Sequence, residues 1–295
     1  MLLKAVSLSR HTPVAALEAL AVQARERQVG AGATIGSGDD QPRGSAFVVV
    51  DGRVAVYQGG LRLNTLRPGK AYGLLETLAG ADADIEARAE LDTLLLEIPA
   101  PTLLSVLEGH HLMTRETIHA LARMVLVTPS WLARTMERPM ELPELVPPES
   151  LDLVDRIGVL QTSGIFSHAH DGSLAEVASY YDEFRAPPGT ILWREGDMAD
   201  WLFVLLEGGV ESRSRTNVRL SWIPRMVPGV FEVLGGAPRW TDATAATPIR
   251  GLRLSTKLLF DAIENNFAMA ADLLSSLAQR VCCQRLAIGR LHGHL

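Results

Sequence analysis

Short apolar runs separated by glycine-containing turns dominate two parts of the chain. Ala46–Val50 is such a run, and the turn Asp51-Gly52 follows it. Trp201–Leu206 is another, and Gly208-Gly209 follows it. Two further runs have the same character: Val54–Tyr57 and Thr93–Ile98. Many short strands with glycine-rich turns are typical of a β-sandwich or β-roll.

Helical patterns flank both groups of strands. Apolar residues recur at helical spacing in Val14–Arg27, before the first group, and in Leu174–Phe184, before the second. Longer amphipathic patterns follow each group, in Thr114–Val125 and in Leu258–Leu291, and the second of these is broken near Asn265-Asn266. The order helix, β-roll, helix is therefore written twice.

The chain also repeats itself in sequence. Gly73–Gly80 resembles Gly229–Gly236 at an offset of 156 residues. The same offset places Phe47 on Phe203 and Asp51-Gly52 on Glu207-Gly208. One offset that holds from about residue 33 to residue 98 indicates a duplication.

A proline-rich stretch separates the two copies. Residues 127–150 contain five prolines, including Pro147-Pro148. Because proline fixes φ and removes a hydrogen-bond donor, this composition predicts a linker. The predicted fold is α+β, with two tandem β-roll (jelly-roll, double-stranded β-helix) domains flanked by helices. The predicted limits are 1–126 for the first domain and 151–295 for the second.

Composition and charge exclude several classes of protein. The chain has 295 residues, a net charge of −6 and 47% hydrophobic residues, and no apolar run is long enough to span a membrane. An acidic chain with scattered Lys and Arg argues against nucleic-acid binding. The two cysteines, Cys282 and Cys283, are adjacent, which predicts free thiols and no zinc site. We expect a cytoplasmic protein.

The glycine pattern of the second copy resembles a known family. Gly189 and Ile191, then Gly196-Asp197, then Gly208 and Val210 resemble the opening of a cyclic nucleotide-binding domain of the Crp/Fnr type. The first copy resembles it less, because Asp39-Asp40 replaces the Gly-Asp corner. Tandem domains of this family occur in kinase regulatory subunits, and single ones occur in bacterial transcription activators.

The resemblance implies a nucleotide site in the second copy, for cyclic AMP or cyclic GMP. In the family a Glu binds the ribose hydroxyl and an Arg binds the cyclic phosphate. The candidate ligand-binding residues are Gly229, Val230, Phe231, Glu232, Pro238, Arg239, Trp240 and Thr241. Val230 stands where the family has the ribose Glu, which removes a hydrogen bond of about 1–2 kcal/mol. Asp242 stands where the family has Thr and would repel a phosphate by several kcal/mol.

In the family the nucleotide phosphate is held by a segment called the phosphate-binding cassette, which corresponds to residues 229–242 in the second copy and 73–86 in the first. The cassette of the first copy departs further from the family. Leu74 replaces the ribose Glu, Ala83 replaces the Arg and Glu86 replaces the Thr. No cation is left to neutralise a phosphate. The resemblance therefore implies that nucleotide binding is lost in the first copy and stays open in the second.

Two features of the cassettes have structural explanations as well. Arg239 can be an exposed loop arginine paired with Asp242 or Glu232, with no ligand involved. Glu76 and Glu232 are equivalent across the copies, so they can simply cap or pair at the short helix.

No catalytic or metal site is predicted. A cupin-like enzyme, which shares the β-roll, needs several histidines on inward-facing strands. His110-His111 lie at the helix after the first roll, and His292 and His294 lie on the tail. A DNA-binding regulator would need about 60–80 further residues of helix-turn-helix after the last helix.

These observations favour a non-enzymatic regulatory or scaffolding protein that works by contact with an unidentified protein partner. The last helix carries apolar residues near helical spacing, namely Leu274, Leu277, Val281, Ile288 and Leu291. It either mediates a homodimer or packs on its own roll. The alternatives for function are a sensor of a cyclic nucleotide or small anion in the second copy, and a cupin-like enzyme.

Overall fold

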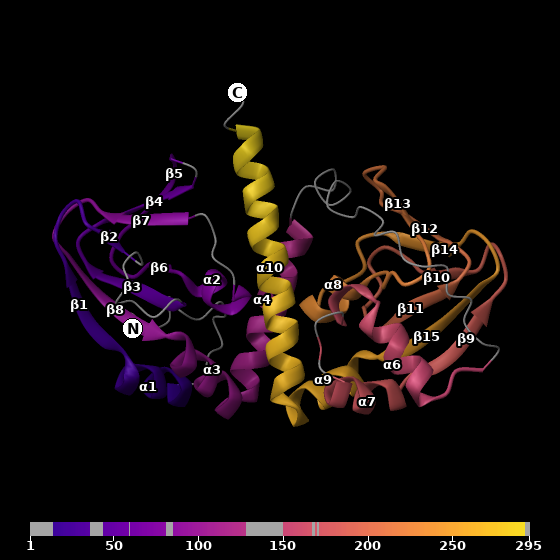
Figure 1. Cartoon of the computed structure of the whole chain (residues 1–295). Coiled ribbons are helices and arrows are strands. Elements are labelled where there is room, and N and C mark those ends of the chain that lie inside the picture. The colour runs from indigo at the N-terminus through magenta and orange to yellow at the C-terminus, as the bar shows by residue number, and fades with distance from the viewer. Residues whose placement is uncertain are drawn as a thin grey trace. The chain divides into compact units, whose positions relative to one another are not determined.

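A computed structural model describes residues 14–35, 44–58, 60–80, 85–127, 150–166, 169 and 171–292. The chain divides into two compact units (Figure 1). Unit 1 comprises residues 1–121 and 274–295, and unit 2 comprises residues 122–273. Most of the predicted linker, residues 128–149, lies outside the described residues, so the predicted domain limits stay predictions.

Unit 1 contains a roll of two antiparallel sheets, with strand orders β1-β8-β3-β6 and β2-β7-β4-β5. Its elements are α1 (Val14–Gln23), β1 (Arg25–Val29), β2 (Thr34–Ile35), β3 (Ser45–Asp51), β4 (Val54–Gln58), β5 (Leu61–Leu66), β6 (Ala71–Tyr72), α2 (Leu74–Ala79), β7 (Ile85–Ala89), β8 (Thr93–Pro99), α3 (Ala100–Gly109) and the first part of α4 (His111–Val127), whose residues from 122 onward belong to unit 2. Phe47 and Leu95 from one sheet pack with Val54 and Ala87 from the other. The core of the roll therefore lies between the two sheets.

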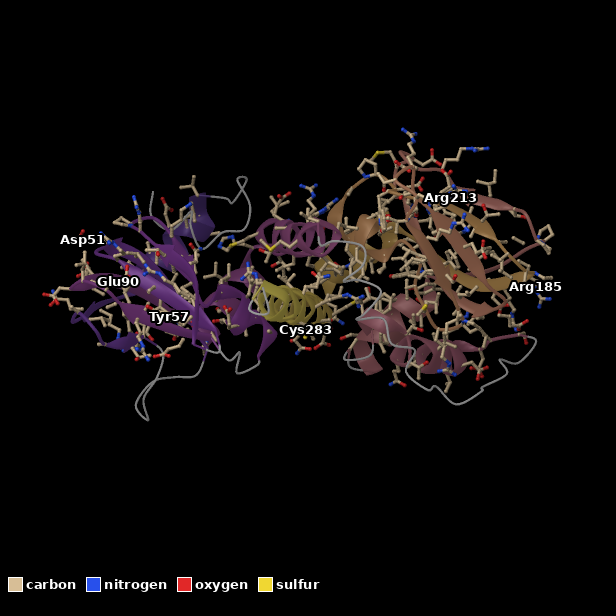
Figure 2. The ribbon with its side chains drawn as sticks, turned by 90° about the horizontal axis from the view of Figure 1, so that it is seen from above. Asp51, Tyr57, Glu90, Arg185, Arg213 and Cys283 are labelled. Carbon is tan, nitrogen blue, oxygen red and sulfur yellow. The ribbon has the colours of Figure 1, made fainter. Side chains whose placement is uncertain are left out.

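Unit 2 repeats this plan, with strand orders β11-β15-β9 and β10-β14-β12-β13. Its elements are α6 (Leu153–Gln161), the 3-10 turn η2 (Gly164–Phe166), α7 (Asp171–Ser179), β9 (Asp182–Ala186), β10 (Ile191–Trp193), β11 (Trp201–Glu207), β12 (Val210–Arg213), β13 (Arg219–Trp222), α8 (Val230–Gly235), β14 (Asp242–Ala245), β15 (Ile249–Ser255) and α9 (Thr256–Asn265), and α10 (Phe267–His292) follows. On β12, Val210 and Ser212 are buried, whereas Glu211 and Arg213 are exposed. Figure 2 shows Arg213 on the outside of the roll. This alternation is that of a strand with one face in the core.

The offset of the duplication extends to the secondary structure. Strands β3 and β11 begin 156 residues apart, and so do the short helices α2 and α8. The same holds for α3 and α9, and for α4 and α10. The predicted fold, two β-rolls flanked by helices, is confirmed, and so is the helix break near Asn266. No helix in the described part of the chain is both long and apolar enough to cross a membrane.

The helices before each roll end earlier than predicted. The prediction of a helix over Val14–Arg27 is wrong after Gln23, because Arg25–Val29 pairs with β8 as an edge strand. The prediction of a helix up to Phe184 fails in the same way, because Asp182–Ala186 pairs with β15. Sheet pairing with a distant strand decides both boundaries against the local helical spacing.

Glycine is required at the turn that follows β3 in unit 1 and at the turn that follows β11 in unit 2. Gly208 has φ +82°, and a Cβ there would lie 2.1 Å from the carbonyl oxygen of Pro248. Gly52, its equivalent in unit 1, has φ +94°, and a Cβ there would lie 2.5 Å from Thr93 Oγ1. Both positions need a left-handed backbone and also have no room for a side chain.

A buried arginine joins three parts of unit 2. Arg250 on β15 is 3% exposed, and it forms ion pairs of 3.0 Å with Glu183 on β9 and with Glu207 on β11. Glu183 also accepts a hydrogen bond from the backbone N–H of Leu151, just before α6. Burial raises the pKa of Glu183, but the bonds from Leu151 and Arg250 outweigh it and hold this pKa below its ordinary value.

Substitution of Gly208 tests how tightly this turn is packed. Gly189 also has φ +82°, but a Cβ added to Gly189 would meet nothing within 4 Å, so Gly189→Ala is a matched control. We expect Gly189→Ala to lower the free energy of unfolding by about 1–2 kcal/mol, the cost of the left-handed backbone. Gly208→Ala should cost roughly 1–3 kcal/mol more, because the methyl group overlaps Pro248. Urea unfolding of the two variants checks this, and equal losses would contradict it.

Substitution of Arg250 tests the ion pairs through pH. Because the pKa of Glu183 is depressed in the folded state, its contribution to stability is full above the unfolded pKa of about 4.3 and is lost as pH falls through the folded pKa. In Arg250→Met the burial of Glu183 loses part of its offset and keeps the bond from Leu151, so its pKa should rise and acid unfolding should begin at a higher pH. NMR titration of the Glu183 carboxyl measures this. The control is Arg215→Met, since that side chain is 80% exposed, and its titration curve should match that of the wild type.

Candidate functional site

The second cassette begins at a glycine that could not be replaced by another residue without a clash. Gly229 has φ +72° and is the N-cap of α8. A Cβ on Gly229 would lie 2.1 Å from Arg239 Nη1 and 3.3 Å from the Trp193 ring. The glycine therefore makes room for the side chain of Arg239 directly beneath the helix.

Arg239 is fully buried, with 1% of its surface exposed. Its Nη1 donates to the carbonyl oxygen of Gly229 at 2.9 Å, and its Nη2 donates to the carbonyl oxygen of Trp201. Its guanidinium carbon lies over the Trp193 ring, 4.2 Å from the ring centroid. The interpretation of Arg239 as an exposed loop arginine is therefore wrong.

The Gly-Asp corner of the roll explains why Arg239 faces inward. The backbone N–H of Arg239 donates to the carbonyl oxygen of Asp197, and its carbonyl oxygen accepts from the N–H of Gly196, both at 2.8 Å. Pro238 forms a bridge with Met198 in the same corner. The Gly196-Asp197 motif thus fixes the backbone on which Arg239 sits.

Asp242, at the position where the family has Thr, is not the partner of Arg239. Its Oδ1 accepts a hydrogen bond of 2.7 Å from the backbone N–H of Glu195. The Asp242 side chain therefore stabilises the turn after β10, and the predicted pairing of Arg239 with Asp242 is wrong.

Glu232 is the carboxylate that acts on Arg239. It is 4% exposed, and burial raises its pKa, while the charge of Arg239 and a backbone hydrogen bond from Trp240 lower it. Burial likewise lowers the pKa of Arg239, and the charge of Glu232 opposes that shift. The net shift raises the pKa of Glu232, so burial of this carboxyl outweighs the effects that favour its charged form.

An aromatic cluster adjoins the guanidinium. Trp193, Trp201, Phe203 and Phe184 contact one another with ring centroids 5.2–6.2 Å apart, mostly edge to face. The sequence interpretation did not include Trp193 or Trp201 in the site. Their position on β10 and at the start of β11, next to the Gly-Asp corner, is the signal that could have identified them.

The other predicted site residues are divided between core and surface. Val230 and Thr241 are buried, at 5% and 3% exposure, Phe231 and Trp240 are partly exposed, and Pro238 is exposed. The structure thus brings together Gly229, Glu232 and Arg239, whereas Pro238 acts through its backbone alone. Their role as ligand contacts stays a prediction.

The first cassette has the same left-handed backbone at its N-cap glycine as the second, but its charged residues differ. Gly73 has φ +83°, and its carbonyl oxygen accepts a 2.6 Å bond from Thr77 Oγ1. Burial, helped by the charges of Glu76 and Glu86, raises the pKa of Tyr72 to about 12. Ala83, at the position of the family Arg, lies outside the described residues. The charges that act on Tyr72 beside this cassette are therefore negative.

Metal-ligand residues do not gather in the part of the chain that the structure describes, where no group of three His, Cys, Asp or Glu could hold an ion. His110 and His111 lie at the junction of α3 and α4 rather than on the strands of the roll. Cys282 and Cys283 on α10 are free thiols, and Cys283 is exposed (Figure 2).

Comparison with known proteins identifies the first copy. Residues 26–110 match the family model of the cyclic nucleotide-binding domain. The CRP-like cAMP-activated global transcriptional regulator of Mycobacterium tuberculosis is 23% identical over 128 residues, which cover 42% of this chain and 57% of the regulator. The chain thus spans little more than half the length of the curated relatives that it matches.

Solved structures of similar proteins have low TM-scores. The N-terminal domain of a transcriptional regulator from Streptomyces coelicolor A3(2) is 26% identical, covers 44% of this chain and 94% of that domain, and has a TM-score of 0.41. The regulatory domain of Toxoplasma gondii PKA, solved with cAMP, is 15% identical, covers 93% of this chain and 94% of that one, and has a TM-score of 0.36.

The family match falls on the copy with the weaker expected resemblance. The match covers the first roll, whereas the quoted glycine motif lies in the second. The second roll repeats the strands and the cassette helix of the first at the offset of 156 residues. The match to the family model of the cyclic nucleotide-binding domain therefore covers residues 26–110, which is the first roll.

Proposed function

We propose that this chain is a non-enzymatic regulatory protein built from two tandem cyclic nucleotide-binding-type domains, 1–126 and 151–295, with a linker at 127–150. It acts by contact with a protein partner, and neither cassette captures a cyclic nucleotide in the ordinary way of the family. The observation that carries the proposal is the burial of Arg239 against internal partners.

Arg239 already has several partners within the protein. It donates to the carbonyl oxygens of Gly229 and Trp201, it stacks on Trp193, and it faces the charge of Glu232. Hydrogen bonds to a charged group contribute about 1.5–3 kcal/mol each, and a desolvated cation–π contact contributes about 2 kcal/mol. A cyclic phosphate would have to replace these interactions before it gained anything from the arginine.

The remaining positions of both cassettes offer little to a nucleotide. Val230 is buried and has no acceptor for a ribose hydroxyl. In the first cassette, Glu76 and Glu86 both act on Tyr72, and Glu86 already accepts hydrogen bonds from Arg88 and Thr34. An anion placed there would meet like charges.

The last helix limits where a partner can bind. Leu274, Leu277 and Val281 on α10 are at most 4% exposed, so these residues are covered within the chain. A homodimer through this helix would therefore need other side chains. Free thiols at Cys282 and Cys283 fit a reducing, cytoplasmic setting.

A second candidate function is a sensor of a small anion in unit 2. The observation that favours it is Arg239 Nε, a buried donor that has no hydrogen-bond partner in the described part of the chain. A buried unpaired donor is costly, and a ligand oxygen would satisfy it.

Calorimetric titration of the full chain with cyclic AMP and cyclic GMP separates the two candidates. We expect no binding in the micromolar range, because Arg239 would have to leave its internal partners. Micromolar binding that is lost in Arg239→Lys, a variant that keeps the charge but loses the planar fork, would overturn the proposal in favour of the sensor. Micromolar binding that Arg239→Lys leaves unchanged would also overturn it and would locate the ligand away from this arginine.

Removal of Arg239 tests its structural role. Arg239→Ala leaves Glu232 buried without its cation and opens space beside Trp193, so we expect a loss of roughly 3–5 kcal/mol in the free energy of unfolding. Arg215→Ala, at a side chain that is 80% exposed, should change it by less than about 0.5 kcal/mol. Urea unfolding followed by tryptophan fluorescence measures both. Similar stabilities for the two variants would show that Arg239 is not part of the folded core.

A further inference from the structure

In each unit the last carbonyl of the cassette helix accepts a hydrogen bond from a long helix. In unit 2, Arg123 Nε on α4 donates to the carbonyl oxygen of Gly235, the last residue of α8, at 2.6 Å. In unit 1, Gln279 Nε2 on α10 donates to the carbonyl oxygen of Ala79, the last residue of α2, at 2.9 Å. We call these two hydrogen bonds the latch contacts.

The latch contacts are copies of one another. Ala79 and Gly235, the acceptors, are 156 residues apart, and so are the donors, Arg123 and Gln279. This is the offset of the whole duplication. The donor belongs in each case to the helix that follows the other roll in sequence, because α4 follows the first roll and α10 follows the second.

The acceptors are groups that need a partner. The last carbonyls of a helix have no partner within it. The C-cap glycines Gly80 and Gly236 bond to carbonyls further back in α2 and α8, and these bonds leave the carbonyls of Ala79 and Gly235 to other donors. A cation at a helix C-terminus also interacts favourably with the helix dipole. Arg123 therefore suits the end of α8 by charge as well as by hydrogen bonding.

The approach of α4 to α8 depends on a missing side chain. A Cβ at Gly235 would lie 3.3 Å from Arg123 Cγ and 3.5 Å from Leu126 Cδ1. Ala79, at the equivalent place, keeps its methyl group, and its carbonyl oxygen also accepts from Ser275 Oγ at 3.4 Å. The two contacts therefore have the same place in the fold but are made by different side chains.

Arginines hold α8 at both ends. Arg239 donates to the carbonyl oxygen of Gly229 at the N-cap, and Arg123 donates to that of Gly235 at the C-terminus. A change at Arg239 that shifts α8 must therefore strain or break the contact with Arg123. Because α4 is continuous from His111 to Val127, a strain at Arg123 acts on that helix.

We propose that the latch contacts couple each cassette helix to the helix that follows the other roll, with Arg123 and Gln279 as equivalent positioning residues. This coupling rests on the proposed regulatory function, since it gives the two domains a route for influencing one another. It requires no nucleotide, so it holds or fails separately from cyclic nucleotide binding.

Hydrogen exchange of the full chain, measured by mass spectrometry without ligand, tests the latch contacts. Loss of the charge-assisted bond from Arg123 should accelerate exchange of the amides that it protects by about tenfold, and loss of the neutral bond from Gln279 should do so by about fivefold. We expect Arg123→Ala to accelerate residues 230–236 and to leave 74–80 unchanged. Gln279→Ala should do the reverse. The control is Arg215→Ala, which should leave both segments as in the wild type.

The coupling itself is tested by a double variant. Arg239→Lys should accelerate exchange in residues 118–127 of α4, and it should add nothing to that segment in an Arg123→Ala background. Arg123→Gln, which copies the donor of unit 1, should restore most of the protection lost in Arg123→Ala. Additive effects of Arg239→Lys and Arg123→Ala, or no response of 118–127 to Arg239→Lys, would overturn the coupling. Failure of Arg123→Gln to restore protection would overturn the equivalence of the two donors.

Discussion

The cassette of the second roll depends on the buried cation Arg239. Arg239 is placed by the Gly196-Asp197 corner, and Gly229 leaves the space that it fills. A guanidinium out of water is costly unless its donors and its charge find partners. The carbonyl oxygens of Gly229 and Trp201, the Trp193 ring and the carboxylate of Glu232 supply most of these partners. The cassette, the corner and the aromatic cluster are therefore one interacting assembly.

The two copies show how a duplicated roll can keep its shape while its chemistry changes. Shape comes from the backbone, through left-handed glycines such as Gly73 and Gly229 and through the pairing of β3 with β8 and of β11 with β15. Charge comes from a few side chains, and here the copies differ. Glu86 in the first copy is bonded to Arg88, while Asp242, its equivalent, holds a backbone N–H.

The cassette helices are short, so their ends matter more than their interiors. Helices of six residues cannot be stable alone and need contacts from outside. In unit 2 these contacts are arginines at both ends of α8, and in unit 1 Gln279 bonds to the end of α2. At the start of α2 the bond to Gly73 comes from Thr77 of the helix itself. A regulatory domain can exploit such a helix, because small changes at either end move the whole element.

Much of the fold was predictable, because it is encoded locally and then repeated. Apolar runs, glycine turns and the offset of 156 residues are properties of neighbouring residues, and they determined two rolls, their flanking helices and the equivalence of the cassettes. The limits of α1 and α7 were not predictable in this way, since strands β1 and β9 exist only through pairing with β8 and β15. Arg239 had the same difficulty. The sequence around Arg239 is typical of a surface loop. Its side chain lies in the core because the backbone of Arg239 bonds to Gly196 and Asp197, which are distant in sequence.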